Sequence, residues 1–311
     1  MAIEIKGHRI STVVVSSVMG HSGGGLFPYT LFPGYRQVMQ AIKETGTTVF
    51  TKSSTALKNT GNFIQWNPLT WKYVQKIDED GLLNAYGQTN DGVLVNAEKI
   101  ALAIKDGYQV IPNFFPQFSQ GIDQVIDDIS FAVDTYRHFL GKNFWALEFD
   151  FSCHNADKEV AENMANALAC VKAIHLAHPD LCLIGKVSHV HPNEFSQELV
   201  RAGVDIIHAI NSIPYDRVYD DGRRSPLARV GGGCVSGGPA WSKAFLYNYL
   251  LRKALPSSVP MIMGCGVARL YDALRYLDLN NNNGAVSICT VIRHDPKEAV
   301  KIIKRLNTSN D

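Results

Sequence analysis

A cysteine stands at the end of an apolar run in the stretch FDFSCHN, residues 149–155, between a serine and a histidine. A thiolate at a strand end can act as a nucleophile or as a base toward a bound ligand, so Cys153 is a candidate catalytic residue. Cys153 and His154 are sequence neighbours, and neighbours in an extended segment point to opposite faces. A thiol hydrolase built on this pair is therefore the weaker interpretation.

Two lysines, Lys52 in FTKSS and Lys186 in IGKVS, also lie within apolar runs. A buried ammonium group needs a partner, because desolvating an unpaired charge costs free energy. Asp150 or Glu148 could be that partner within the protein. Two lysines at equivalent strand positions favour contact with a bound ligand instead.

The elements that must position these residues alternate regularly. Eight apolar or β-branched runs are each followed by a helical segment, and several of these segments stop at a glycine. This order predicts an α/β fold, a (β/α)8 TIM barrel that forms a single domain over residues 1–311, with EIKGHRI as a small N-terminal hairpin across the barrel bottom. The predicted strands are 13–17, 48–54, 109–115, 145–151, 181–187, 205–211, 261–266 and 285–290, and the predicted helices are 34–46, 96–107, 122–141, 158–178, 193–203, 241–255, 268–279 and 296–306.

Two connections are much longer than the rest, 55–95 after the second strand and 212–240 after the sixth. Long loops on the C-terminal face of a barrel commonly cover a ligand. The second loop is polar and rich in glycine, so it is either a mobile lid or an ordered surface insertion.

The last two strand ends point to a phosphate-bearing cofactor. Gly264, Cys265 and Gly266 follow the seventh strand and Cys289 and Thr290 follow the eighth, where many barrels hold a phosphate on backbone N–H groups. Glycine at a strand-to-helix turn also has a purely conformational explanation. No strand-linked GxGxxG and no GxxxxGK[ST] is present, so neither a dinucleotide fold nor a P-loop is supported.

Composition narrows the class of protein. Of 311 residues 46% are hydrophobic and the formal net charge is +1, so a large core is expected and nucleic acid is not an expected partner. The N-terminus lacks the apolar core of a signal peptide and no run approaches the ~18 apolar residues of a membrane span, which favours a cytoplasmic protein with no membrane partner.

Metal and disulfide sites are not expected. The six cysteines form no Cys-x-x-Cys pair, which favours reduced thiols over disulfides or structural zinc. Two histidine pairs, 175 with 178 and 189 with 191, have spacings that a metal could use, but no carboxylate completes either set.

Several motifs, in order and in register, resemble those of the dihydroorotate dehydrogenase family, class 1. FTKSSTALKNTGN (50–62) is similar to the family's lysine-bearing T-K-[ST]-[ST]-T…G-N segment, and GLLNAYGQTNDG (81–92) is similar to its L-N-x-x-G-x-x-N-x-G loop. LEFDFSCHN (147–155) resembles E-L-N-x-S-C-P-N, and GKVS, INS, SGGPA, MIMGCGV and GAVSICT follow with the family's spacing. The similarity covers nearly the whole chain.

The resemblance implies that the barrel is an FMN-binding domain that oxidises dihydroorotate to orotate in pyrimidine biosynthesis. Cys153 would be the base that removes the C5 proton while hydride passes to flavin N5. The implied substrate contacts are Lys52, Asn84, Tyr86, Gly87, Gln88, Asp150, Asn155, Asn211 and Ser212. The implied cofactor contacts are Ser17, Lys52, Ser53, Asp150, Lys186, Ile210, Gly238, Cys265, Gly266, Cys289 and Thr290.

The KSST segment is closest to class 1A, which implies a homodimer that uses a small electron acceptor such as fumarate. The chain departs from the family pattern where Asp150 replaces an asparagine, His154 a proline, and Cys265 and Cys289 glycines. Two alternatives therefore stay open: a divergent flavin-binding barrel that acts on another cyclic amide or pyrimidine, and a non-catalytic flavin-binding protein.

Overall fold

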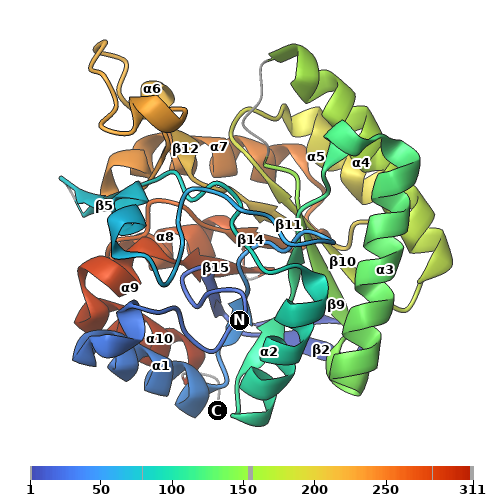
Figure 1. The fold of residues 1–311 in the computed structure, drawn as a ribbon, viewed down its shortest axis with the longest axis horizontal. Coiled ribbons are helices and arrows are strands. Elements are labelled where there is room, and N and C mark those ends of the chain that lie inside the picture. Colours follow the sequence, from blue (N-terminus) through green and yellow to red (C-terminus); the bar gives the residue numbers. More distant parts are fainter. Residues whose placement is uncertain (1, 79, 153–156, 282, 309–311) are drawn as a thin grey trace.

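The computed structural model describes residues 2–78, 80–152, 157–281 and 283–308. Within this part of the chain, nine parallel strands form one sheet in the order β7-β4-β3-β15-β14-β11-β10-β9-β8, with helices around it (Figure 1). The sheet curls into a nearly closed barrel, so the predicted TIM-barrel fold is confirmed. Its uninterrupted strands are β3 (Val13–Ser16), β4 (Thr48–Phe50), β9 (Ala146–Asp150), β10 (Cys182–Val187), β11 (Ile206–Ala209), β14 (Met261–Met263) and β15 (Gly284–Ile288).

The predicted strand at 109–115 is divided into β7 (Gln109–Ile111) and β8 (Asn113–Phe114). Pro112 separates them because proline has no N–H to donate to a ladder, while its carbonyl accepts a bond of 3.0 Å from the backbone N–H of Glu148. β7 pairs with β4 and β8 pairs with β9. Both ends of the sheet therefore come from one segment, which occupies a single barrel position.

Helices cover the outside of the barrel. α1, for example, begins with Pro33 at its first turn and ends at Gly46, whose φ of 59° is left-handed and suits glycine. The helices are α1 (Pro33–Thr45), α2 (Val93–Lys105), α3 (Ile122–Leu140), α4 (Asp157–Ala177), α5 (Asn193–Ala202), α6 (Tyr215–Val218), α7 (Trp241–Ala254), α8 (Leu270–Leu279), α9 (Thr290–His294) and α10 (Pro296–Asn307). Short 3-10 turns are η1 (Tyr29–Leu31), η2 (Pro68–Tyr73), η3 (Phe118–Gln120), η4 (Gly141–Asn143), η5 (Ala228–Val230) and η6 (Gly238–Ala240).

The predicted N-terminal hairpin is present as β1 (Ile3–Ile5) and β2 (His8–Ile10), at the lower end of the barrel in Figure 1. Ile3 and Ile10 are buried and pack against the lowest inward-facing side chains of the barrel. The barrel side chains in this lower apolar cluster are Val14, Phe50, Ile111, Ala146, Cys182, Ile184, Ile206, Ile262 and Ala285.

The two long loops join in a second sheet, which lies near the opposite end of the barrel (Figure 1). It is antiparallel, in the order β12-β13-β6-β5. β5 (Val74–Ile77) and β6 (Gly81–Asn84) come from the first loop, and β12 (Ile213–Pro214) and β13 (Cys234–Gly237) come from the second. Sequence reasoning treated the two loops separately. The suggestion that the second loop is a mobile lid stays a prediction.

Two further expectations concern the whole chain. The described cysteines, Cys170, Cys182, Cys234, Cys265 and Cys289, are free thiols, as predicted. No helix among the described residues combines the length and the apolar character that crossing a membrane requires.

Candidate functional site

A cavity of about 790 Å³ lies where the barrel strands end, beneath the second sheet. This volume falls within the range of roughly 300–1,000 Å³ that is typical of small-molecule sites. The predicted site residues that line it are Ser17, Lys52, Ser53, Asn84, Tyr86, Gly87, Gln88, Asp150, Lys186, Ile210, Asn211, Ser212, Cys265, Gly266, Cys289 and Thr290. Gly238 is not among the lining residues, and the predicted Cys153 and Asn155 lie outside the described part of the chain.

The period of two along each strand stacks the inward-facing residues in layers. On β9, Glu148 lies two residues beyond Ala146, which belongs to the lower apolar cluster. The Nδ1 atom of His208 is 2.5 Å from Glu148 Oε1, and the amide of Asn113 donates a hydrogen bond to Oε2. Glu148 and His208 are at most 1% exposed, and neither lines the cavity. Each oxygen of this carboxyl group therefore has a partner inside the protein.

Asp150, two residues further along β9, lines the cavity and is 3% exposed. Its Oδ2 accepts a hydrogen bond of 2.8 Å from Ser53, and its Oδ1 accepts bonds from the backbone N–H and the hydroxyl of Ser152. Burial alone would raise the pKa of Asp150, but the charge of Lys186 and the hydrogen bonds from Ser152 and Ser53 lower it below its usual value. Asp150 is therefore a carboxylate at neutral pH.

The hydrogen-bond donors to Asp150 are two serine residues and not a lysine. Among the described residues no ion pair joins Asp150 to Lys52 or to Lys186, so the interpretation of a simple salt bridge is not supported. Asn211 donates a hydrogen bond of 2.6 Å to the hydroxyl of Ser152 and so orients this hydroxyl.

Lys186 lies beside Asp150, because these two residues are partners in the parallel pairing of β10 with β9. Burial would lower the pKa of Lys186, but Glu148 and Asp150 outweigh burial and raise it. The residue is 5% exposed, and within the described chain its ammonium group has no hydrogen-bond acceptor. Lys186 is thus a fixed positive charge with unused donors in the cavity.

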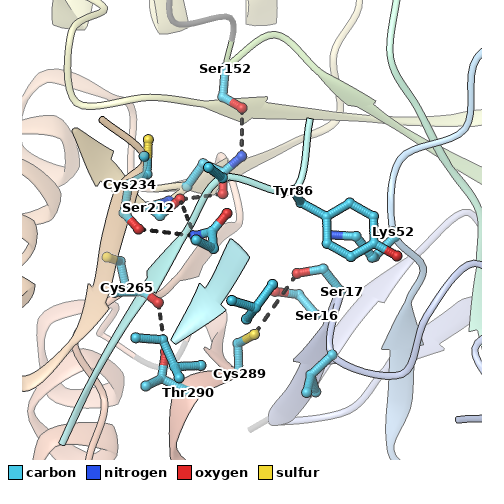
Figure 2. Close-up of a pocket in the computed structure, with 18 of the residues that line it drawn as sticks. Ser16, Ser17, Lys52, Tyr86, Ser152, Ser212, Cys234, Cys265, Cys289 and Thr290 are labelled. Carbon is cyan, nitrogen blue, oxygen red and sulfur yellow. Dashed lines mark hydrogen bonds between the residues drawn. The ribbon is translucent and has the colours of Figure 1, made fainter. Parts of the chain in front are cut away.

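Lys52 differs from Lys186 in its surroundings. Its Nζ atom lies 3.7 Å from the centre of the Tyr86 ring (Figure 2), which in turn stacks on Phe63. Burial is the main cause, and repulsion by Lys186 a further one, of a pKa for Lys52 that is lowered to about 8. Lys52 therefore loses its proton at a lower pH than an ordinary lysine.

The loop that carries Tyr86 packs closely against residues 60–62. Gly87 has φ +77°, and a Cβ atom there would lie 2.7 Å from the backbone nitrogen of Asn62. Glycine is required at position 87 both by its backbone conformation and by this close approach.

Cys265, Cys289 and Thr290 also line the cavity (Figure 2), and the Cys289 sulfur lies 3.9 Å from the Ser17 hydroxyl. The Thr290 hydroxyl donates a hydrogen bond of 2.8 Å to Ser236, and Cys265 has the left-handed φ of +66° that is uncommon for a side chain other than glycine. Gly266 needs no ligand to explain it, because a Cβ atom there would lie 2.7 Å from the Cα atom of Trp241.

Sequence reasoning missed Arg293, which lines the same cavity from α9. Its guanidinium carbon lies 4.1 Å from the centre of the Tyr29 ring. The Nη1 atom is buried without a hydrogen-bond partner in the described chain, and burial lowers the pKa of Arg293. Its place one helical turn after Thr290, past the eighth strand, was the signal that could have identified it.

Comparison with known proteins identifies no relative. No protein-family model matches the chain, and a search of curated proteins found no match.

Proposed function

We propose that this protein is a flavin-dependent oxidoreductase that binds FMN in the cavity and oxidises dihydroorotate to orotate. The supporting observation is the convergence of residues from separate strand ends. Sixteen side chains or backbone positions that motif resemblance singled out, from Ser17 to Thr290, line one cavity of about 790 Å³.

The cavity's donors suit a ligand that carries phosphate and a polar ring. Lys52, Lys186 and Arg293 all line it, and none has a carboxylate within ion-pair distance in the described chain. A buried guanidinium or ammonium group without an acceptor is costly, so an anionic ligand would be stabilised here. Asp216 and Asp150 are the cavity's only acidic lining residues among those described.

FMN would be held by two groups of residues. Ser17, Lys52, Ser53 and Lys186 would contact its ring, with Lys186 at the N1/O2 edge. Cys265, Gly266, Cys289 and Thr290 would contact the ribityl phosphate arm, where Arg293 would add the missing counter-charge. When bound, FMN supplies the redox chemistry, as the acceptor of the two electrons that leave the substrate.

The chain's own residues would bind and deprotonate the substrate. Asn84 donates to the carbonyl of Cys234 at 3.1 Å, and its side-chain oxygen accepts no hydrogen bond from the described residues, so it can accept one from a ring amide. Asn211 already donates to Ser152 and accepts from the N–H of Ser212, so binding substrate through it would require an exchange of partners. Cys153 would take the proton from C5.

The proposal is tested by adding FMN to FMN-free protein and following the quenching of flavin fluorescence. One FMN per chain should bind, and anaerobic dihydroorotate should then bleach the visible flavin absorbance. Cys153→Ser should retain FMN but slow bleaching by about 10²–10⁴-fold, the usual contribution of a positioned base. Cys234→Ser changes another cavity thiol and should leave both properties intact. Protein that binds no FMN would refute the proposal.

Asp150 favours a second candidate, oxidation of a cyclic amide that has no carboxylate. A buried carboxylate at the cavity wall would repel the carboxylate of dihydroorotate if the two lay close together. Bleaching by dihydrouracil but not by dihydroorotate would select this candidate. Bleaching by neither, with FMN bound, would point to a non-catalytic flavin-binding protein.

The electron acceptor and the assembly belong to the same proposal. We expect reoxidation by fumarate and not by NAD, and a homodimer. Anaerobic mixing of the reduced protein with each acceptor, and light scattering for the mass in solution, would decide between these outcomes and their alternatives.

A further inference from the structure

We infer that Asp150 sets the reduction potential of a flavin bound in this cavity, because its carboxylate offsets the positive charge that Lys186 presents there. This inference rests on the proposed function, since it needs FMN to bind. It assigns to Asp150 a role other than hydrogen bonding to substrate.

The sheet places the two residues side by side. Asp150 and Lys186 are register partners on neighbouring parallel strands, and the N–H of Phe151 donates a bond of 3.0 Å to the carbonyl of Lys186. Neighbouring strands lie about 4.8 Å apart. Both side chains line the cavity, so a ring bound there experiences both charges together.

Hydrogen bonds also orient the carboxylate of Asp150. Three donors, the hydroxyl of Ser53 and the hydroxyl and backbone N–H of Ser152, fix its two oxygens. These donors are neutral, so they orient the charge and stabilise it without cancelling it. The lysine and the aspartate together therefore present little net charge, whereas a neutral residue 150 would leave one uncompensated positive charge.

Glu148 does not fill this role. It lies one layer deeper, has His208 and Asn113 on its two oxygens, and does not line the cavity. The variants tested below all keep Glu148, so the electrostatic effect of Glu148 is the same in each of them.

Reduction adds electrons, and with them negative charge, to a flavin ring. A nearby positive charge stabilises the reduced ring and a nearby negative charge destabilises it. Asp150 should therefore make the bound flavin a weaker oxidant of substrate and a stronger donor to the acceptor than the same site with a neutral residue.

The test is the midpoint potential of bound FMN, measured anaerobically against a reference dye, in the unaltered protein and in Asp150→Asn. Asparagine can accept from Ser152 through its oxygen and donate to Ser53 through its nitrogen, so the local structure should survive. We expect the ratio of reduced to oxidised flavin at a given potential to rise at least tenfold, about 30 mV for a two-electron couple.

Three further variants complete the experiment. Asp216→Asn removes the same charge from the exposed rim of the cavity and should shift the potential far less. Lys186→Gln should shift it in the negative direction. Asp150→Ser, which needs no new bond to Ser53, should shift it positively if the asparagine variant does not fold.

Equal potentials for the unaltered protein and both Asp150 variants, or an equal shift in Asp216→Asn, would overturn the inference and leave the proposed function intact. Failure of every protein to bind FMN would overturn the proposed function as well.

Discussion

Glu148 and Asp150 are two carboxyl groups two residues apart on β9, on the same face of the strand, yet their surroundings differ. Glu148 is enclosed, with His208 on one oxygen and Asn113 on the other. Asp150 lines the cavity beside Lys186, whose donors are unused in the described chain. We call Glu148, His208 and Asn113 the closed layer, because both oxygens of the Glu148 carboxyl group have partners within the protein. The open layer is the set of charged residues that line the cavity and have unused donors or face them: Lys52, Asp150, Lys186 and Arg293. The comparison distinguishes polar groups whose partners lie within the protein from cavity-lining groups whose donors are available to a ligand.

The largest effect on stability should come from a substitution of Glu148 in the closed layer. Glu148→Ala removes both hydrogen-bond acceptors and leaves His208 and Asn113 buried without them. We expect the free energy of unfolding to fall by about 2–6 kcal/mol, because each of the two buried polar groups left without an acceptor costs about 1–3 kcal/mol. Urea unfolding followed by circular dichroism measures it.

Two variants serve as controls for that prediction. Glu148→Gln keeps an acceptor for His208 and should lose less stability. Asp150→Asn, in the open layer, should change the free energy of unfolding by less than about 1.5 kcal/mol. Equal losses at positions 148 and 150 would remove the distinction between the two layers.

A substitution of Arg293, in the open layer, should change the affinity for FMN more than the free energy of unfolding. Arg293→Met removes a guanidinium group whose Nη1 has no partner in the described chain, and keeps much of the packing against Tyr29. We expect the Kd for FMN to rise at least tenfold, about 1.4 kcal/mol, while the free energy of unfolding stays within about 1 kcal/mol.

Arg217 provides the matched control for Arg293, because it also lines the cavity but is exposed at the rim. Arg217→Met should leave the Kd for FMN within about twofold, as exposed charges contribute little. An unchanged Kd in Arg293→Met, or a large loss of stability, would show that Arg293 is a structural residue.

These two layers also show what could be predicted from sequence. The strands and the helices were predictable because apolar runs and helical periodicity alternate without interruption, and the strand ends named the cavity's lining because a parallel barrel brings them together. Pro112 divides one predicted strand into β7 and β8 without changing the fold.

Long-range pairing was not predictable. The joining of β6 with β13 depends on contacts between loops about 150 residues apart, which no local pattern in either loop reveals. The sequence placed Asp150 and Lys186 at strand ends, but only the register of β9 with β10 and the bonds from Ser53 and Ser152 distinguish a pair of adjacent charges from a salt bridge. Arg293 belonged to none of the motifs, so its place after Thr290 was the one sequence signal for it, and its unpartnered nitrogen in the cavity is a structural observation.

The smallest predicted effect is a pH dependence that distinguishes the two lysines of the open layer. The pKa of Lys186 is raised, since Glu148 and Asp150 outweigh burial, whereas burial lowers the pKa of Lys52 to about 8. An anionic ligand favours protonated Lys52 and raises its pKa in the complex, so affinity should fall as the pH rises through about 8. The FMN phosphate is already dianionic there, because its second pKa is near 6.

Between pH 7 and pH 9 the charged fraction of Lys52 falls about tenfold, which corresponds to at most ~1.4 kcal/mol of binding free energy. We therefore expect the Kd for FMN, measured by fluorescence titration, to rise several-fold over this range in the unaltered protein. Lys52→Met should bind more weakly at pH 7 and lose this rise, because the titrating group is gone. Lys186→Met should bind more weakly yet retain the rise, since Lys186 keeps its proton throughout. Identical pH profiles for the unaltered protein and Lys52→Met would mean that Lys52 does not contribute its charge to the bound ligand, and the open layer would then rely on Lys186 and Arg293.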